Sequence, residues 1–314
     1  MNTPRHEQDS PPCGRILVIR GGAIGDFILT LPAIAALRRQ FPSLHLEVLG
    51  YPHIVQLALA GGLVDRVEPI EARGLAGFFA RHGQLAENLA DYFSEFDIIV
   101  SYLFDPDEIF RSNVARCSPA QFIQGPHRPD ESAGLPASQV YLKPLERLAI
   151  FGADPVPRLS IQGRPEKTGI IALHPGSGSA QKNWPEARWS ELLQKLIDWT
   201  DRDLLLVGGE AEGERLQRLA AALPPGRIQV AQSLPLAELA KLLERCGGFL
   251  GHDSGISHLA SALGLPGLVL WGPTVEAVWR PTGERVRILR APGDLGALTA
   301  DLVLERLQQS LQPD

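Results

Sequence analysis

Short apolar segments alternate with amphipathic ones along nearly the whole chain, and this alternation is the feature that most restricts its fold. The first apolar run, Arg15-Ile-Leu-Val-Ile-Arg20, predicts a buried strand. The segment that follows, to about Gln40, carries its apolar residues at helical spacing. Strands that alternate with helices in this way form parallel sheets covered by helices. We therefore expect an α/β fold with doubly wound parallel sheets.

The same patterns predict the remaining elements. In the first half, strands are expected at 44–50, 64–70, 97–103 and 121–124, and helices at 53–60, 75–94, from 106 onward and at 138–151. In the second half, strands are expected at 169–174, 203–208, 227–231, 248–251, 267–271 and 285–289, and helices at 185–199, 210–222, 235–245, 254–263 and 296–311.

A stretch rich in proline and glycine, residues 152–167, interrupts the alternation and predicts an interdomain linker. It separates a first domain, 15–151, from a second domain, 168–314, and 314 residues suffice for two cores. Two such domains imply a ligand cleft between them. Residues 1–14 are polar and contain prolines, so we expect a flexible N-terminal tail and not a signal peptide. The last helix is a candidate to pack back on the first domain.

Composition restricts the partners of the chain. A formal net charge of −6 argues against general nucleic-acid binding, which needs a basic surface. The three cysteines, Cys13, Cys117 and Cys246, lie far apart, form no metal-type pair and fit a reducing cytosol. No stretch approaches the ~18 apolar residues of a membrane span. We expect a cytoplasmic protein without a bound metal or cofactor. Peripheral contact with the inner face of the cytoplasmic membrane stays open.

The stretch from Phe249 to Thr274 contains the end of a predicted strand, a group of small and polar residues, and then a helix. Either Asp253 or Ser254 can cap that helix. Its free first-turn N–H groups would then point outward from the carboxyl edge of the sheet, where a phosphate can bind. An ordinary capped helix explains the stretch equally well when it is taken alone. His252 and His258 have no evident partner in the sequence and are interpreted as structural.

The segment from His174 to Pro185 follows another predicted strand at the same sheet edge. Ser177 and Gly178 allow close backbone approach and hydroxyl contacts, and Lys182 supplies a positive charge. The alternative is a flexible loop before a helix that starts with proline. The shared sheet edge favours the phosphate interpretation.

Two acidic residues follow Val207-Gly-Gly209 at this edge, namely Glu210 and Glu212. A carboxylate in this position can bind ribose hydroxyls, as in dinucleotide sites. An ordinary helix start is the slightly favoured alternative.

The first predicted loop, Gly21-Gly-Ala-Ile-Gly-Asp26, does not have the glycine spacing of a dinucleotide fingerprint. The acidic residue expected at the end of the second strand is also missing, because Leu49-Gly50 stand there. An NAD(P) site is therefore disfavoured. Asp26 begins a helix at the cleft edge, where it acts either as a first-turn acid that favours the helix dipole or as a general base. The residues alone leave both roles open.

The motif Asp105-Pro-Asp107 has the form of a metal-binding D-x-D pair. A plainer interpretation is a helix start, with Asp105 as N-cap, Pro106 at the first helical position and Glu108 completing a capping box. We favour the cap, because no His, Cys or Asp cluster has metal-ligand spacing.

One basic stretch stands out in the first half. The segment from Phe110 to Pro129 contains no acid but carries Arg111, Arg116, His127 and Arg128. In an acidic chain it is a candidate seat for an anionic acceptor. A patch of solvated arginines is the more common outcome.

Together these motifs resemble glycosyltransferase family 9, the ADP-heptose:lipopolysaccharide heptosyltransferases, from about Arg15 to Leu311. The matching segments are Ile19-Arg-Gly-Gly-Ala-Ile-Gly-Asp26 with Leu31-Pro32, His174-Pro-Gly-Ser-Gly178, Lys182 with Trp184-Pro185, Val207-Gly-Gly209, His252-Asp-Ser-Gly-Ile-Ser-His258 and Gly272-Pro-Thr274. The resemblance implies the GT-B architecture, two Rossmann-like domains that face each other across a cleft. It also implies inverting, metal-independent transfer.

By this resemblance, Asp26 is the general base, and Lys182 is the second catalytic residue. The positions implied for donor binding are Ser177, Gly178, Lys182, Glu212, Asp253, Ser254, Gly255 and His258. Glu212 is a looser match, which Glu210 could replace. The acceptor-binding segments of the family show no match here, and Gly22, Arg111 and Arg128 are our candidates for that side.

We therefore expect a cytoplasmic glycosyltransferase that moves a heptose-like sugar from a nucleotide diphosphate, ADP-heptose by the resemblance, to a lipopolysaccharide-core or related anionic glycan. The donor is a co-substrate, and no other cofactor is expected. One alternative is a non-catalytic nucleotide-sugar-binding protein on the same fold, against which the presence of Asp26 speaks. The other is an NAD(P)-dependent oxidoreductase, which the missing fingerprint disfavours.

Overall fold

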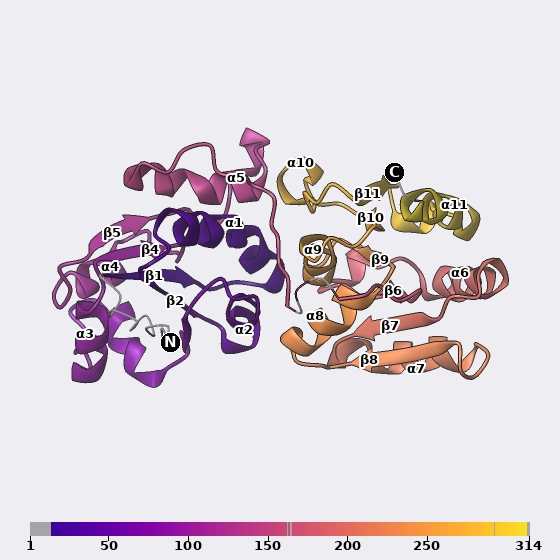
Figure 1. Ribbon diagram of the computed structural model, residues 1–314, viewed down its shortest axis with the longest axis horizontal. Coiled ribbons are helices and arrows are strands. Elements are labelled where there is room, and N and C mark those ends of the chain that lie inside the picture. The colour runs from indigo at the N-terminus through magenta and orange to yellow at the C-terminus, as the bar shows by residue number, and fades with distance from the viewer. Residues whose placement is uncertain (1–13, 162, 164, 292, 313–314) are drawn as a thin grey trace, which may run out of the picture.

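The computed structural model describes residues 14–161, 163, 165–291 and 293–312. The tail expected over 1–14 lies outside the described residues except for Gly14, and so do residues 162 and 164 of the expected linker. Two parallel sheets lie beside each other along the long axis of the molecule, each flanked by helices (Figure 1). The predicted α/β class with two doubly wound parallel sheets is confirmed.

The first sheet has five parallel strands in the order β3-β2-β1-β4-β5. They are β1 (Arg15–Arg20), β2 (His45–Gly50), β3 (Arg66–Pro69), β4 (Ile98–Ser101) and β5 (Gln121–Gln124). The α-helices of this half are α1 (Ile24–Gln40), α2 (Pro52–Ala60), α3 (Glu87–Ser94), α4 (Ile109–Val114) and α5 (Ala137–Leu142). The strand order reverses at β1, so the loop after β1 lies where ligands bind in such sheets.

The second sheet has six parallel strands in the order β11-β10-β9-β6-β7-β8. They are β6 (Ile171–Leu173), β7 (Leu204–Gly208), β8 (Ile228–Gln232), β9 (Gly248–His252), β10 (Gly267–Trp271) and β11 (Val286–Arg290). Its α-helices are α6 (Glu186–Trp199), α7 (Gly213–Ala221), α8 (Leu236–Arg245), α9 (Gly255–Ala262), α10 (Glu276–Trp279) and α11 (Ala300–Leu311). Here the order reverses between β6 and β9, the strands that precede the two predicted phosphate-binding segments.

The last helix, α11, packs within the second half. It lies against α6, β10 and β11, and its buried Val303 and Leu307 belong to the core under the second sheet. The side chain of Leu311 contacts Gly248 at the start of β9. The expectation that this helix packs back on the first domain is therefore wrong.

The single helix expected over 75–94 is also wrong. The chain instead forms a 3-10 helix η1 (Arg73–Phe79), a turn, and then the short α3. Gly77 and Gly83 approach so closely that a Cβ on either residue would collide with the backbone of this turn. His82, between them, has a φ of 52°. Because the crossing needs two glycines and a left-handed residue, it breaks the helix that the apolar spacing predicts.

The helix after β4 begins later than expected. Asp105, Pro106, Asp107 and Glu108 form a turn in which the Glu108 N–H donates to the Asp105 carbonyl at 3.1 Å. Pro106 occupies the second position of that turn, which suits its fixed φ. The expected capping box is thus wrong in register, since α4 starts at Ile109. The Asp105 carboxylate still accepts the Phe110 and Arg111 N–H groups, at 3.1 and 2.9 Å.

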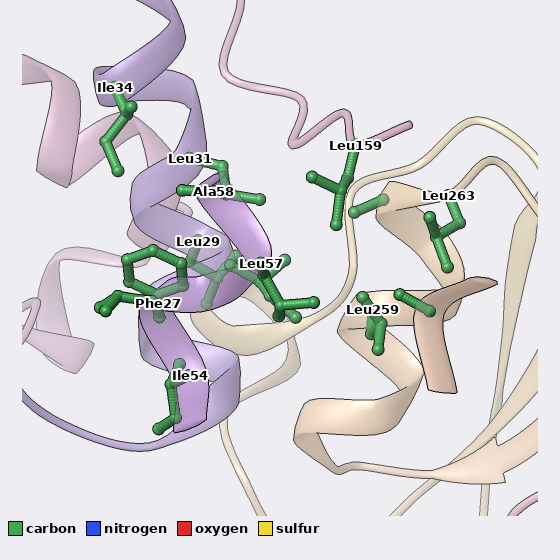
Figure 2. Close-up of a cluster of buried hydrophobic side chains, with 14 of the residues drawn as sticks. Phe27, Leu29, Leu31, Ile34, Ile54, Leu57, Ala58, Leu159, Leu259 and Leu263 are labelled. Atoms are coloured by element: carbon green, nitrogen blue, oxygen red, sulfur yellow. The ribbon is translucent and has the colours of Figure 1, made fainter. Parts of the chain in front are cut away.

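A continuous apolar core joins the two halves. It includes side chains from α1 and α2 of the first half and from α8 and α9 of the second, where α1 packs against α9 and α2 against α8. Leu159 of the connecting segment lies between the halves, near Leu57 and Leu263 (Figure 2). Its N–H donates to the Ala262 carbonyl at 2.8 Å, and its side chain contacts Gly61. The junction between the sheets is therefore an interior and not a loose hinge.

Candidate functional site

A cleft of about 400 Å³ opens between the two halves, at the carboxyl ends of both sheets. Its walls include eight of the residues predicted from sequence for the site, namely Asp26, Arg128, Gly178, Lys182, Asp253, Ser254, Gly255 and His258. The lining does not include Gly22, Arg111, Ser177 or Glu212. Residues from both halves of the chain thus meet in one cavity.

The N-termini of α1 and α9 form the floor of this cleft, because each helix starts just after the strand at which its sheet reverses. Gly25 and Gly255 let the two helix starts touch. A Cβ on Gly255 would lie 2.6 Å from the Ile24 Cβ and 3.0 Å from the Gly25 nitrogen. A Cβ on Gly25 would in turn lie 3.2 Å from the His258 ring. Side chains at either position would push the walls of the cleft apart.

Asp26 lies in the first turn of α1, and its side chain is 27% exposed. Its Oδ2 accepts the Ala23 N–H at 3.0 Å, which closes the start of the helix. Its Oδ1 lies 3.7 Å from Nη2 of Arg20, whose side chain is buried. The carboxylate therefore stabilises the helix start and also faces the cleft, so its position is compatible with both roles left open by the sequence.

Lys182 and Asp253 form an ion pair on the opposite wall, with 2.7 Å between Nζ and Oδ2. The Thr274 hydroxyl donates to the same Oδ2 at 2.5 Å. Ser254 is the N-cap of α9, and its Oγ accepts the Ser257 N–H at 3.4 Å. The ammonium group of Lys182, although its charge is balanced by Asp253, and the first-turn N–H groups of α9 are donors suited to a phosphate group.

The histidines near this wall are buried and neutral. Burial lowers the pKa of His174 to about 3, and it lowers the pKa values of His252 and His258 to about 4. His252 Nε2 accepts the Trp184 N–H at 2.9 Å, and its Nδ1 bonds to the Gly176 carbonyl at 3.1 Å. His252 therefore supports the loop that carries Lys182, in agreement with its structural interpretation. His258 lines the cleft.

Two of the predicted donor residues point into their own loops. The Ser177 hydroxyl lies 2.7 Å from the Ser179 carbonyl and 2.8 Å from Asn183 Oδ1. Glu212 accepts the Gly209 N–H at 2.9 Å, as the helix-start interpretation of this segment expects. The Glu212 side chain also packs against Gly176. Both residues shape the walls from behind.

The basic stretch of the first half divides in the structure. Arg111 is exposed and donates to Glu108 at 2.9 Å, away from the cleft. Arg128 lines the cleft and lies 5.4 Å from the ring centre of Trp279, a residue of the second half. The Trp279 Nε1 donates to Glu131 at 2.8 Å, which ties the two halves together at the cleft.

Sequence patterns missed two residues that shape the site, Arg20 and Trp279. Arg20 is the last residue of β1, and the sequence pattern around it indicates only where that strand ends. Trp279 lies in a short helix beyond the last motif. Apart from the contact between Arg20 and Asp26, the hydrogen bonds of these two residues join positions 82 to 148 residues apart, which no local spacing encodes.

Gly22 has a φ of 104°, a left-handed conformation that favours glycine. A Cβ there would lie 2.9 Å from Asp26 Oδ2. Gly22 does not line the cleft, but the absence of a side chain at this position leaves space for the Asp26 carboxylate.

Within the described part of the chain, no group of three His, Cys, Asp or Glu side chains is arranged to hold a metal ion. In the same residues, no helix has the length and apolar character needed to cross a membrane.

Comparison with known proteins gives matches to heptosyltransferases. The family model for "Glycosyltransferase family 9 (heptosyltransferase)" matches residues 150–298. Lipopolysaccharide heptosyltransferase 1 of Escherichia coli O18:K1:H7 is 33% identical over 132 residues, which cover 42% of this chain and 40% of that protein. Lipopolysaccharide heptosyltransferase 3 of Escherichia coli is 22% identical over 301 residues, 82% and 83% of the two chains. The match to the first relative thus spans about two fifths of its length.

Among solved structures, the E. coli ADP-heptose lipopolysaccharide heptosyltransferase II superposes with a TM-score of 0.75. The two chains are 20% identical, and the match covers 95% of this chain and 98% of the other. A likeness at this identity shows the fold. It confirms the expected architecture of two Rossmann-like parallel-sheet domains.

Proposed function

Because the chain belongs to glycosyltransferase family 9, we propose that it transfers a heptose-like sugar from ADP-heptose to a lipopolysaccharide-core or related glycan acceptor. One observation carries the proposal. Asp26, which can accept a proton, and Lys182 with the start of α9, which can bind a diphosphate, face one cleft from opposite halves. A glycosyltransferase needs these two groups on either side of the transferred sugar.

In the proposed reaction, the acceptor hydroxyl loses its proton to the Asp26 carboxylate as its oxygen bonds to the anomeric carbon. The bond from that carbon to the diphosphate oxygen breaks, and its electron pair leaves with ADP. Attack from the side opposite the leaving group inverts the anomeric configuration. Asp26 is suited to this role because its carboxylate is held at a helix start and still reaches the cleft.

The donor diphosphate would lie against the second half. Negative charge builds on the leaving oxygen, and Lys182 together with the first-turn amides of α9 would stabilise it without a metal ion. Asp253 holds Lys182 at 2.7 Å, so the ammonium group is already directed to this wall. Residues 168–314 would therefore form the donor domain, 15–151 the acceptor domain, and 152–167 the linker.

The acceptor would approach along the first half. Arg128 places a positive charge in the cleft wall beside Asp26, which favours an anionic glycan. Arg111 lies away from the cleft and contributes to a more distant contact at most. We place the reaction in the cytoplasm, since the spaced cysteines fit a reducing compartment. Contact with the inner face of the membrane would bring the enzyme to a lipid-linked acceptor.

The substitution Asp26→Asn tests the proposal directly. We expect kcat to fall by roughly 10²–10⁴-fold and the donor KM to change little, because Asn keeps the helix-start hydrogen bond but takes up no proton. The assay is ADP release from ADP-heptose in the presence of heptose-deficient lipopolysaccharide. Asp97→Asn is a matched control, since Asp97 accepts the Arg15 N–H at the opposite edge of the same sheet. A variant at position 26 that keeps most of the wild-type rate overturns the proposal.

Chelation tests the proposed independence of metal ions. We expect the rate to survive EDTA, because Lys182 and backbone N–H groups meet the charge of the diphosphate. Loss of turnover that Mg²⁺ or Mn²⁺ restores would contradict this part of the proposal. It would also make Asp105 and Asp107 candidate ligands again.

A further inference from the structure

Arg20 is a buried arginine directly behind the proposed base. It ends β1, and its side chain is 2% exposed. Charged side chains are buried this deeply only where other groups compensate the charge, because removal from water costs several kcal/mol. Its surroundings therefore indicate what the guanidinium does.

Backbone carbonyl groups accept most of the Arg20 hydrogen bonds. Its Nη1 donates to the His127 carbonyl at 2.9 Å and to the Tyr102 carbonyl at 3.4 Å, while Nη2 donates to the Asp26 carbonyl at 3.4 Å. The guanidinium carbon also lies 4.5 Å from the ring centre of Tyr141. Its Nε finds no hydrogen-bond partner among the described residues.

These neighbours leave the positive charge only partly compensated, and the Asp26 carboxylate is the group that completes it. Oδ1 of Asp26 lies 3.7 Å from Nη2, too far for a hydrogen bond but close enough for the two opposite charges to attract each other. The other oxygen, Oδ2, is fixed by the Ala23 N–H. The carboxylate is thus held from two sides while one edge stays open to the cleft.

The same guanidinium also holds the segment after β5, which is the other part of the proposed acceptor side. The carbonyl that Nη1 contacts at 2.9 Å belongs to His127, and the next residue is Arg128, which lines the cleft. Arg20 therefore links β1, the start of α1 and the segment after β5 through one planar group. Lysine could supply the charge but could not reach several carbonyls in this fixed geometry.

We propose that Arg20 is a positioning residue for the transfer reaction, which holds the Asp26 carboxylate and the His127–Arg128 segment in register at the cleft. This inference rests on the proposed function. Arg20 touches neither substrate, so its effect passes through Asp26 and through the place of Arg128. Removal of the guanidinium should slow the transfer without weakening the binding of ADP on the opposite wall.

The test uses Arg20→Gln, Arg20→Lys and Asp26→Asn, alone and combined, with ADP-heptose and heptose-deficient lipopolysaccharide. We expect Arg20→Gln to lower kcat by about 10²-fold, the cost of a small misplacement of a reacting group. Arg20→Lys should fall between Arg20→Gln and the wild type. In the Asp26→Asn background, each change at position 20 should slow the reaction less than it does in the wild type, because only the part that passes through Arg128 remains. The rise in melting temperature that ADP causes should persist in all variants.

Arg38→Gln is the matched control. Arg38 lies on α1 like Asp26, donates to the Leu63 and Leu44 carbonyls and pairs with Asp65, but lies at the other end of the helix. It should cost stability and leave kcat close to the wild-type value. If Arg20→Gln fails to fold, Arg20→Lys decides, and a wild-type rate for it overturns the inference.

The outcomes separate this inference from the function on which it rests. A wild-type enzyme without ADP release, or an Asp26→Asn variant of nearly wild-type rate, overturns the proposed function and the inference with it. A slow Asp26→Asn beside an Arg20→Gln of normal rate overturns the inference alone. An equal loss from Arg20→Gln in both backgrounds also overturns it, because no part of the effect would then pass through Asp26.

Discussion

At the scale of single residues, Lys182 offers the most direct test of ligand binding. It enters the cleft from the loop after β6, and Asp253 holds it at 2.7 Å. ADP at 100 times its Kd should stabilise the wild type by about 2.7 kcal/mol, a shift of several degrees in melting temperature. Lys182→Ala should lose most of this shift, because the variant lacks the positive charge that is proposed to bind the diphosphate.

Lys195→Ala is the control for this measurement. Lys195 lies on α6, outside the cleft, and its Nζ pairs with Oδ1 of Asp301 on α11 at 2.7 Å. The ADP shift should stay unchanged in this variant. A shift that survives Lys182→Ala would place the diphosphate elsewhere, and a shift with NAD(H) but not with ADP would favour the oxidoreductase.

Three buried histidines predict how stability depends on pH. Burial lowers the pKa of His174 to about 3 and the pKa values of His252 and His258 to about 4, against about 6.5 in the unfolded chain. Between pH 6.5 and 4 the unfolded chain therefore binds more protons. The stabilisation is complete above pH 6.5 and declines as the pH falls, by about 1.4 kcal/mol per pH unit for each histidine.

Urea unfolding at pH 7.5, 6.0 and 5.0 measures this decline as a falling midpoint. His252→Gln, which removes one titrating group, should reduce the slope by about a third while it lowers stability at pH 7.5. Carboxylates such as Glu186, whose pKa is lowered by Arg218, lose their contribution mainly below about pH 5, outside the measured range. A midpoint that stays constant down to pH 5 would contradict the burial of these rings as the cause.

How much of the site could be read from sequence depends on how local its signals are. Asp26, Lys182 and Asp253 follow predicted strands, and the carboxyl ends of parallel strands meet at one edge, so their arrival in one cleft could be predicted. The role of Arg20 could not, because its partners other than the nearby Asp26 include backbone carbonyls 82 and 107 residues away. The roles of all these residues stay predictions until the variants are measured.

At the scale of elements, the contact between α1 and α9 sets the width of the cleft. In Gly255→Ala the new Cβ would meet the Ile24 Cβ at 2.6 Å, and the backbone of a helix start cannot easily yield. We expect a loss of about 1–3 kcal/mol in unfolding free energy and a lower kcat, since the walls move apart. Gly169→Ala is the control, because its Cβ would have an ordinary contact at 3.6 Å. Equal melting temperatures for the two variants would contradict this account.

The elements that the sequence misplaced share one physical cause. The break between η1 and α3 depends on Gly77 meeting Gly83, and the late start of α4 depends on a turn around Pro106. In the first place an apolar spacing predicts a helix, and in the second a capping pattern does. In both, a backbone contact that these patterns do not indicate prevents the predicted helix from forming there. The strands were predicted to within three residues at each end. The inner strands of both sheets are buried on both faces, which gives them continuous apolar runs, whereas the edge strands β3, β5, β8 and β11 are partly exposed.

At the scale of the whole molecule, the shared core determines how the two halves respond to stress. Apolar side chains of α1, α2, α8 and α9 form one cluster across the junction, with Leu159 between them (Figure 2). Interfaces between domains are usually more polar than a domain core, and they allow the domains to move separately. Here the apolar contact should couple the unfolding of one half to that of the other.

The chain contains its own probes for this coupling. All five tryptophans lie in the second half and all four tyrosines in the first. Tryptophan fluorescence and the second-derivative absorbance of tyrosine therefore report the two halves separately during urea unfolding. We expect one transition with the same midpoint by both signals, because loss of either half exposes the core of the other.

The substitution Leu159→Ala tests the coupling. It should lower the unfolding free energy by about 2–5 kcal/mol, and both midpoints should fall together. Leu242→Ala is the control, because Leu242 is at an exposed position of α8. It should change the unfolding free energy by less than about 0.5 kcal/mol. Two separate midpoints in the wild type would show that the halves unfold independently, and the core across the junction would then be contact without coupling.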